Sequence, residues 1–149
     1  MINIVLYEPE IPQNTGNIAR MCVSNDLTLH LIKPLGFEIS DKYLKRSALD
    51  YWEFLDLQLY DNWEDFLMKN LDVRFWLLTT KSQNVYWDMK FQEGDFLVFG
   101  PETRGLPEEL LQAHHQRAIT VPMRSDNARS LNLASTTQTV FYEAFRQLR

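Results

Sequence analysis

The 149-residue sequence predicts an α/β fold in which a mostly parallel sheet carries helices on both faces. Short apolar runs rich in β-branched and aromatic residues alternate with longer segments whose apolar residues recur at helical spacing. One such run, Phe96-Leu-Val-Phe99, leads through a glycine-containing turn into a segment that begins Pro107-Glu-Glu109. A strand, a tight turn and a helix in this order are the building unit of parallel sheets.

The first elements follow from local chemistry. Residues 2–7 are an apolar, β-branched run and predict a strand, which Pro9 ends. Residues 15–25 then predict a helix with Asn14 as its N-cap, because the side chain of asparagine accepts hydrogen bonds from helix N–H groups. Residues 27–32 are the next strand.

The middle of the chain continues the alternation. Residues 41–53 predict a helix, since their apolar side chains fall near helical spacing, and residues 54–60 predict a short strand. Residues 62–70 predict a helix with one aromatic face, and residues 73–80 predict a strong apolar strand.

The last third supplies the remaining elements. Residues 95–100 predict a buried strand, and a helix opens at Pro107 with acidic residues in its first turn. Residues 118–121 predict the final strand, and residues 131–148 predict a long amphipathic helix. No repeat, low-complexity tract or linker interrupts the chain, so residues 1–149 are expected to form one domain.

Composition narrows the class of protein. No run approaches the length of a membrane span, and no signal peptide precedes the first strand, which favours the cytoplasm. The lone Cys22 has apolar neighbours and is expected to pack in the core. The net charge of −5 argues against nucleic acid as a partner, but acidic residues concentrate between residues 50 and 72. Arginines and lysines near the polar loops could therefore still form a phosphate-binding patch.

Three polar segments follow predicted strands, where α/β folds place their ligands: residues 14–20, 99–106 and 124–132. In the second, Gly100 and Gly105 have the spacing of a phosphate-binding P-loop, but Leu106-Pro107 replaces its Lys-Ser/Thr. This absence favours a ligand other than a nucleoside triphosphate.

Each segment also has a purely structural interpretation. Arg20 can be a solvated side chain on a capped helix, and Glu102 with Arg104 can be a surface ion pair in a tight turn. Ser130 can be the N-cap of the last helix, with Asn132 in its first turn.

The histidines and the known short motifs predict no further catalytic or metal site. The adjacent His114 and His115 have no further metal ligands at suitable spacing and are expected at a surface helix end. His30 lies in a predicted strand and is expected to be a core or sheet histidine. The sequence contains no GxSxG, GxGxxG or zinc motif, and no metal site is predicted.

These segments carry a resemblance to a known family. Asn14-Thr-Gly-Asn-Ile-Ala-Arg20, Phe99-Gly-Pro-Glu-Thr-Arg-Gly105 and Ser130-Leu-Asn-Leu133 resemble the three motifs of SPOUT-superfamily RNA 2′-O-methyltransferases. The stretches Ile4-Val-Leu-Tyr-Glu-Pro-Glu-Ile-Pro12, Leu49-Asp-Tyr51 and Tyr142-Glu-Ala144 are similar to the small TrmL/YibK-like group, which methylates the wobble nucleotide of tRNA. The resemblance covers essentially the whole chain.

The resemblance implies properties that spacing alone does not show. It implies a deep trefoil knot in the C-terminal segment, which is otherwise nearly absent from proteins. It implies S-adenosyl-L-methionine as cofactor, the tRNA anticodon stem-loop as substrate, with cytidine or uridine as the methylated nucleotide, and a homodimer whose active sites are completed by the partner chain. No membrane and no metal are implied.

The resemblance also assigns residues. The catalytic set is Arg20 with Asn14, Glu102, Ser130 and Asn132 in support. The cofactor-binding set is Leu78, Thr79, Gly100, Glu102, Gly105, Val121, Pro122, Ser130 and Leu131. The tRNA-binding set is Lys42, Lys45, Arg46, Arg124, Arg129 and Tyr142.

The chemistry of methyl transfer suits the catalytic set. A ribose 2′-hydroxyl is a weak nucleophile that must be positioned and partly deprotonated. Arginine is normally protonated, so Arg20 either acts as a base in an unusual environment or holds phosphate and stabilises the developing alkoxide. Both roles agree with the sequence.

Two other functions are compatible with parts of the sequence. A catalytically inactive RNA-binding dimer of the same fold would lack cofactor binding, and the joint presence of the motif residues argues against it. A nucleotide hydrolase is disfavoured by the missing P-loop lysine.

For assembly, the aromatic residues Phe141, Tyr142 and Phe145 predict an interface on the last helix, the alternative being a helix packed wholly within its own domain.

Overall fold

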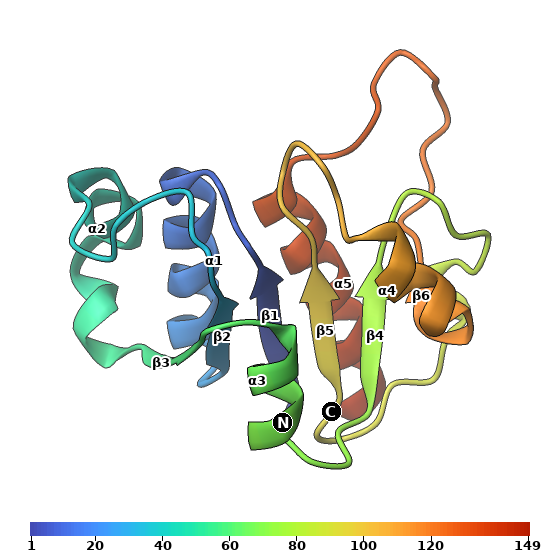
Figure 1. The fold of residues 1–149 in the computed structure, drawn as a ribbon, viewed down its shortest axis with the longest axis horizontal. Coiled ribbons are helices and arrows are strands. Elements are labelled where there is room, and N and C mark those ends of the chain that lie inside the picture. Colours follow the sequence, from blue (N-terminus) through green and yellow to red (C-terminus); the bar gives the residue numbers. More distant parts are fainter.

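The structure, a computed structural model, describes the backbone of residues 1–149 and every side chain except those of residues 48 and 49. In this described chain, six strands form one sheet in the order β3-β2-β1-β5-β4-β6, and each pair is parallel (Figure 1). The strands are β1 (Asn3–Tyr7), β2 (Thr28–Ile32), β3 (Asp56–Tyr60), β4 (Phe75–Leu78), β5 (Phe96–Phe99) and β6 (Ala118–Ile119). The predicted α/β class is confirmed, and the sheet is wholly parallel.

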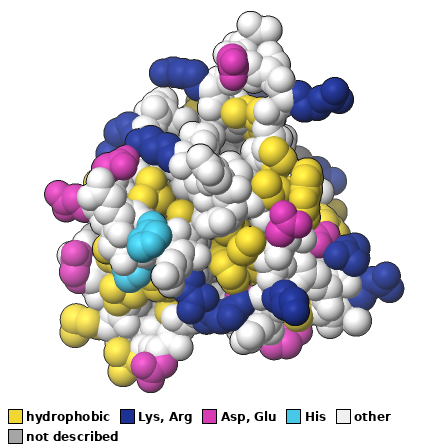
Figure 2. Space-filling view, turned by 90° about the vertical axis from the view of Figure 1, so that its right-hand side faces the viewer, with side chains coloured by type: hydrophobic (Ala, Val, Ile, Leu, Met, Phe, Trp, Pro, Cys, Tyr) yellow, Lys and Arg dark blue, Asp and Glu magenta, His cyan; other side chains and the backbone are white. Residues whose placement is uncertain are grey.

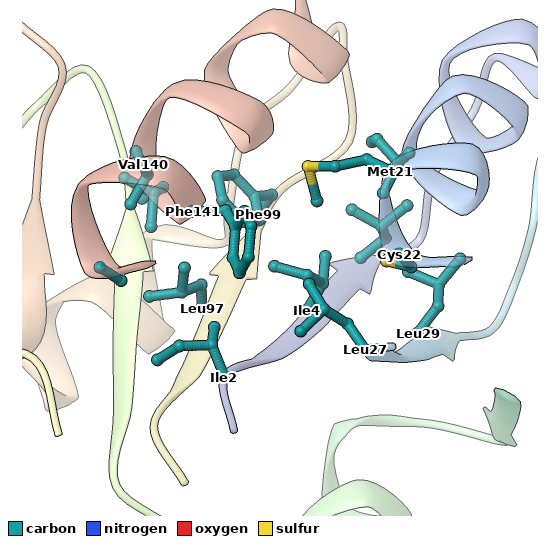
Figure 3. Close-up of a cluster of buried hydrophobic side chains, with 14 of the residues drawn as sticks. Ile2, Ile4, Met21, Cys22, Leu27, Leu29, Leu97, Phe99, Val140 and Phe141 are labelled. Atoms are coloured by element: carbon teal, nitrogen blue, oxygen red, sulfur yellow. The ribbon is translucent and has the colours of Figure 1, made fainter. Parts of the chain in front are cut away.

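Helices cover both faces of the sheet, as predicted. They are α1 (Pro12–Ser24), α2 (Lys42–Ala48), α3 (Trp63–Lys69), α4 (Glu108–Ala113) and α5 (Leu133–Leu148). The larger core lies between the sheet and helices α1 and α5, where Ile4, Leu97 and Phe99 meet Cys22 and Val140 (Figure 3). The opposite core joins Val5, Leu77 and Val98 to Phe66 of α3 and Leu111 of α4. No helix in the described chain is long and apolar enough to cross a membrane.

The predicted cap of the first helix is wrong. Helix α1 begins at Pro12, two residues before Asn14, with Ile11 at the N-cap position. Proline suits the first turn because its fixed φ is helical and its missing N–H has no intrahelical partner there. Asn14 is therefore buried inside the helix, where its side chain is available for contacts with other segments.

The start of the last helix also differs from expectation. Helix α5 begins at Leu133, and its N-cap is Asn132, whose Oδ1 accepts a hydrogen bond from the amide of Ser135 at 3.1 Å. Ser130 is not the cap, because it lies two residues further upstream, in the preceding loop.

Several other boundaries moved. The helix predicted over residues 41–53 is α2 followed by a 3₁₀ segment, Leu49–Phe54. The strands are shorter than predicted at their ends, and β6 keeps two residues before an isolated bridge between Val85 and Thr120. Two 3₁₀ turns, Tyr86–Asp88 and His115–Arg117, had no signal in the apolar pattern.

The aromatic residues of α5 divide between core and surface. Phe141 is 1% exposed and belongs to the core under the sheet (Figure 3), so its predicted place in an interface is wrong. Tyr142 and Phe145 remain 44% and 43% exposed. Tyr142 is one position after Phe141, about 100° around the helix, and therefore turns away from the core. Phe145, one turn further along, keeps its ring centroid 5.9 Å from that of Phe141.

Cys22 and the histidines lie where expected. Cys22 is fully buried, and burial raises the pKa of its thiol. His114 ends α4 at the surface with its ring against Phe75. His30 is 4% exposed in β2, with Nε2 3.0 Å from Asn3 Oδ1 and Nδ1 2.8 Å from the hydroxyl of Tyr60. The neutral ring satisfies both contacts, donating to Asn3 and accepting from Tyr60.

The burial of His30 makes stability depend on pH. Desolvation lowers its pKa from 6.5 to about 4, and the charge of Asp56 only partly opposes this. Between pH 6.5 and about pH 4, the unfolded chain binds a proton at this histidine and the folded chain does not, so stability falls as the pH decreases through this range. We expect a loss of about 2 kcal/mol in the free energy of unfolding between pH 7 and pH 5. Urea unfolding at several pH values would measure this loss. If the free energy of unfolding of His30→Gln fell equally between pH 7 and pH 5, the effect would belong to other groups.

Candidate functional site

A cavity of about 590 Å³ opens at the carboxyl edge of β4, β5 and β6. Its walls are the loops that follow these strands, together with the segment that leads into α5 (Figure 1). The lining side chains and backbone come from residues 78–81, 99–106, 120–121, 123 and 129–133, with Ile11, Asn14 and Thr136 from the two neighbouring helices. The three polar segments singled out in the sequence therefore meet at one place.

The turn after β5 requires glycine at two positions. A Cβ on Gly100 would lie 2.4 Å from the amide nitrogen of Leu106 and 2.5 Å from the carbonyl carbon of Gly105. Gly105 has a φ of +70°, which side-chain-bearing residues rarely adopt, and its amide donates to the carbonyl of Pro101 at 2.9 Å. The turn thus folds back on its own backbone and presents main-chain groups to the cavity.

Three motif residues form one hydrogen-bonded chain. The Glu102 carboxylate accepts from the amides of Glu10 and Ile11 at 2.8 and 2.9 Å, and from Asn14 Nδ2 at 3.2 Å. Asn14 Oδ1 in turn accepts from Asn132 Nδ2 at 3.1 Å. This series of hydrogen bonds joins the turn after β5 to the first turns of α1 and α5. The segment that begins α1 has its amides satisfied by a distant carboxylate instead of a local cap.

The alternative of a Glu102–Arg104 surface pair is wrong. Arg104 Nη2 instead lies 3.2 Å from a carboxylate oxygen of Glu8, and its Nε lies 3.7 Å from Glu10. Both acids precede α1. The charged residues of the turn thus face the segment after β1. The Glu102 carboxylate accepts hydrogen bonds from the amides of Glu10 and Ile11 and forms no ion pair with Arg104.

Known proteins resemble this chain over its whole length. Residues 1–142 match the SpoU rRNA Methylase family. A tRNA (cytidine(34)-2′-O)-methyltransferase of Saccharophagus degradans is 48% identical, over 99% of this chain and 96% of that protein. A structure solved for insights into the 2-OH methylation of C/U34 on tRNA is 44% identical, with a TM-score of 0.94 over 99% of this chain and 95% of that one.

The chain belongs to the SpoU methylase family. Its resemblance to SPOUT RNA methyltransferases is thereby confirmed. At the level of fold alone, an AdoMet-bound rRNA methyltransferase of Sinorhizobium meliloti is similar, with 22% identity and a TM-score of 0.86 over 97% of this chain and 56% of that one.

The residues that family resemblance assigns to the cofactor gather in the cavity. Its lining includes Leu78, Thr79, Gly100, Glu102, Gly105, Val121, Ser130 and Leu131. Pro122 is not among the lining residues, although Val121 and Met123 on either side of it are. The lining combines apolar side chains with the main chain of a glycine turn, which suits a nucleoside-like ligand.

The residues that family resemblance assigns to catalysis are divided between two places. Asn14, Glu102, Ser130 and Asn132 line the cavity, but Arg20 does not. Arg20 lies six positions after Asn14 on α1, about 9 Å along the helix axis. Its guanidinium is exposed and stacks on the ring of Tyr51 at 5.3 Å. The structure therefore places Arg20 beside the cavity and not within it.

The residues assigned to tRNA are distributed over separate elements. Lys42 and Arg46 of α2 lie 5.2 and 6.0 Å from the ring of Tyr43, and Lys45 borders a second groove near the ends of β2 and β3. Arg129 lines the cavity, and Arg124 is exposed in the same loop. Tyr142 is on α5, where its hydroxyl accepts from Asn25 Nδ2 at 3.2 Å. Figure 2 shows Lys and Arg side chains at the upper end of one face and others lower on the same face.

Some lining residues are absent from the sets assigned from the sequence. Lys81 borders the cavity and its Nζ lies 2.7 Å from a carboxylate oxygen of Glu108. Its position just after a predicted strand could have indicated it. Among the described side chains, no group of three or more His, Cys, Asp or Glu residues is arranged to hold a metal ion.

Proposed function

We propose that this protein transfers a methyl group from S-adenosyl-L-methionine to the ribose 2′-hydroxyl of the wobble nucleotide, cytidine or uridine at position 34, of tRNA. The observation that carries the proposal is the meeting of three family motifs at one cavity through Glu102, Asn14 and Asn132. The substrate assignment is supported by relatives that share nearly half their residues with this chain over its full length.

The cavity fits the proposed cofactor. Apolar side chains of Leu78, Val121 and Leu131 would contact the adenosine part, and the backbone of the Gly100 turn would provide its polar contacts. A side chain at position 100 would overlap the backbone of Gly105 and Leu106 and would destroy this cradle. When bound, the cofactor supplies an electrophilic methyl group, which needs no metal ion to be transferred.

The remaining chemistry falls to this chain's own residues. The 2′-hydroxyl must be held in line with the methyl group and must lose its proton as it attacks. We assign to Arg20 the stabilisation of negative charge that develops on the 2′-oxygen or lies on the adjacent phosphate, because a guanidinium is protonated at neutral pH. Asn14, on the same helix, would keep α1 in register with the cavity through Glu102 and Asn132.

The proposal includes the larger assembly. We infer that residues 1–149 act as one methyltransferase domain with a trefoil knot in the C-terminal segment, in the cytoplasm, where tRNA is found. We further infer a homodimer in which the partner chain completes each active site. The position of Arg20 outside the cavity of its own chain agrees with such a shared site. The anticodon stem-loop is the proposed contact region of the tRNA.

Two measurements test the proposal. Calorimetry in the presence of EDTA is expected to detect binding of S-adenosylhomocysteine, the product of methyl transfer. Mapping of 2′-O-methylated nucleotides in tRNA from cells with and without the protein is expected to show loss at position 34. Binding of tRNA without binding of S-adenosylhomocysteine would instead support the inactive RNA-binding dimer.

Salt should weaken tRNA binding despite the acidic net charge. Each phosphate contact is expected to add roughly 0.7–0.9 to the slope of log K against log salt concentration. Replacing both Lys42 and Arg46 with alanine should therefore reduce that slope by about 1.5. Filter binding at several salt concentrations measures it. Lys69→Ala on α3 is the matched control, and an unchanged slope in the double variant would exclude α2 from the contact.

Tyr142→Asp is expected to weaken the homodimer without unfolding the chain. Tyr142 is 44% exposed, so an aspartate is solvated in the monomer but becomes a buried, unpaired charge in the proposed interface. Sedimentation should then show a shift toward monomer, together with reduced methyl transfer. Met68→Asp, at an exposed position of α3, is the control. Sedimentation of the wild-type protein as a monomer at micromolar concentration would refute the dimer.

A further inference from the structure

The segment after β1 and the turn after β5 each supply a glutamate whose carboxylate accepts hydrogen bonds from the other segment. Glu102, from the turn, accepts hydrogen bonds from the amides of Glu10 and Ile11. Glu10 accepts in the opposite direction, from the amide of Thr103 at 2.8 Å. We call these two glutamates and their partners the carboxylate clasp. Its two halves are 92 residues apart in sequence, so it is a tertiary contact between two loops that border the cavity.

Glu10 makes the denser set of contacts in the turn. Besides the Thr103 amide, its two carboxylate oxygens lie 2.8 and 2.9 Å from the hydroxyl of Thr103, and Arg104 Nε lies 3.7 Å away. The hydrogen bonds from Thr103 hold the pKa of Glu10 below its usual value, so the carboxylate is ionised at neutral pH. Its side chain is 28% exposed, so solvent reaches the carboxylate only in part.

The backbone under Glu10 is fixed from the other side. The amide of Gly36 donates to the carbonyl of Pro9 at 2.9 Å, and a Cβ on Gly36 would lie 2.7 Å from the Glu10 carbonyl oxygen. The loop after β2 therefore packs directly against residues 9 and 10. The backbone of Glu10 is therefore held by a neighbouring loop, whereas Thr103 and Arg104 in the turn are exposed. A segment of this kind depends on its polar contacts for its shape.

We propose that Glu10 is a positioning residue that holds the turn of residues 101–105 in its cofactor-binding shape and couples that turn to the start of α1. The proposal rests on the function proposed above. The coupling is reciprocal, because a turn that leaves Glu10 also withdraws Glu102 from the amides before α1 and from Asn14. Occupancy of the cavity and placement of the helix that carries Arg20 then vary together.

Glu10→Ala, Glu10→Gln and Glu93→Ala test the proposal. Glutamine keeps an oxygen for the Thr103 amide without the negative charge, and Glu93 is an exposed glutamate paired with the N-terminal amine at the other edge of the sheet. Calorimetry with S-adenosylhomocysteine reports the cavity. Hydrogen exchange of the amides at residues 10, 11, 13–15 and 103–105 reports the two halves of the clasp without requiring cofactor or tRNA.

We expect Glu10→Ala to weaken S-adenosylhomocysteine binding about tenfold, as when the competent turn is populated about a tenth of the time. Exchange should increase by about the same factor in both amide groups, since they open together. Glu10→Gln is expected to retain most of the affinity, within about threefold, because its oxygen replaces the acceptor. Glu93→Ala should behave as wild type.

Two results would overturn the proposal. One is wild-type affinity and exchange in Glu10→Ala; the other is an equal loss in Glu10→Gln, which would assign the effect to charge and not to placement. If Glu10→Ala does not fold, Thr103→Val serves in its place, because it removes the hydroxyl and keeps the amide. Failure of the wild-type protein to bind S-adenosylhomocysteine would contradict the proposed function, whereas the exchange comparison would still decide the clasp.

Discussion

Arg20→Ala should lower the rate of methyl transfer by at least about 100-fold, the usual cost of removing one group that stabilises charge in a transition state. Affinity for S-adenosylhomocysteine should stay within about twofold, because Arg20 does not line the cavity and its guanidinium lies over the ring of Tyr51. Single-turnover assays on tRNA and calorimetry on the same preparation measure the two quantities.

Two further variants sharpen this result. Arg20→Lys keeps the charge without the forked donor geometry, so it should recover only part of the rate. Arg146→Ala, an exposed arginine of α5 that pairs with Glu143, is the control for loss of a surface arginine. Wild-type turnover in Arg20→Ala would make Arg20 a surface charge only, and loss of cofactor affinity would place it in the binding site.

Gly100→Ala is expected to abolish detectable cofactor binding, a loss of at least about 100-fold. The added Cβ would overlap the backbone of Gly105 and Leu106, neither of which can yield without opening the turn. Overpacking of this kind also costs about 1–3 kcal/mol of stability. Calorimetry with S-adenosylhomocysteine and urea unfolding would measure the two effects.

Gly94→Ala is the matched control for this substitution. Gly94 has a φ of +86°, so alanine is strained there, but no atom would lie within 4 Å of its Cβ. Stability should fall by roughly 1–2 kcal/mol while affinity for S-adenosylhomocysteine is kept. Equal affinities in the two glycine variants would show that the turn of Gly100 does not form the cofactor site.

Much of this architecture follows from local sequence. The apolar run of residues 96–99 and the acids that follow Pro107 predict a strand and a helix by chemistry that acts over a few residues. Their alternation along the chain predicts a parallel sheet with helices on both faces. The special role of Gly100 and Gly105 was also visible, since two glycines after a strand indicate a close backbone turn.

The candidate site was predictable as a set of segments and not as a set of roles. Asn14 was expected as a local cap and Asn132 as a first-turn residue, but their side chains bond to each other across 118 positions. Glu10 had no role in the sequence, because its partner Thr103 lies 93 positions away. Phe141 and Tyr142 are adjacent aromatics that only the packing of α5 on the sheet separates into core and surface.

Local sequence is enough to predict the class of fold, the order of the elements and the three segments that carry the chemistry. These depend on backbone preference and apolar periodicity, which act between residues close along the chain. Tertiary structure alone decided that Glu102 serves the start of α1, that Glu10 holds the turn in return, and that Arg20 stands outside the cavity. Those relations depend on which loops, far apart in the sequence, the parallel sheet brings together at one edge. Local sequence patterns do not show which distant loops become neighbours.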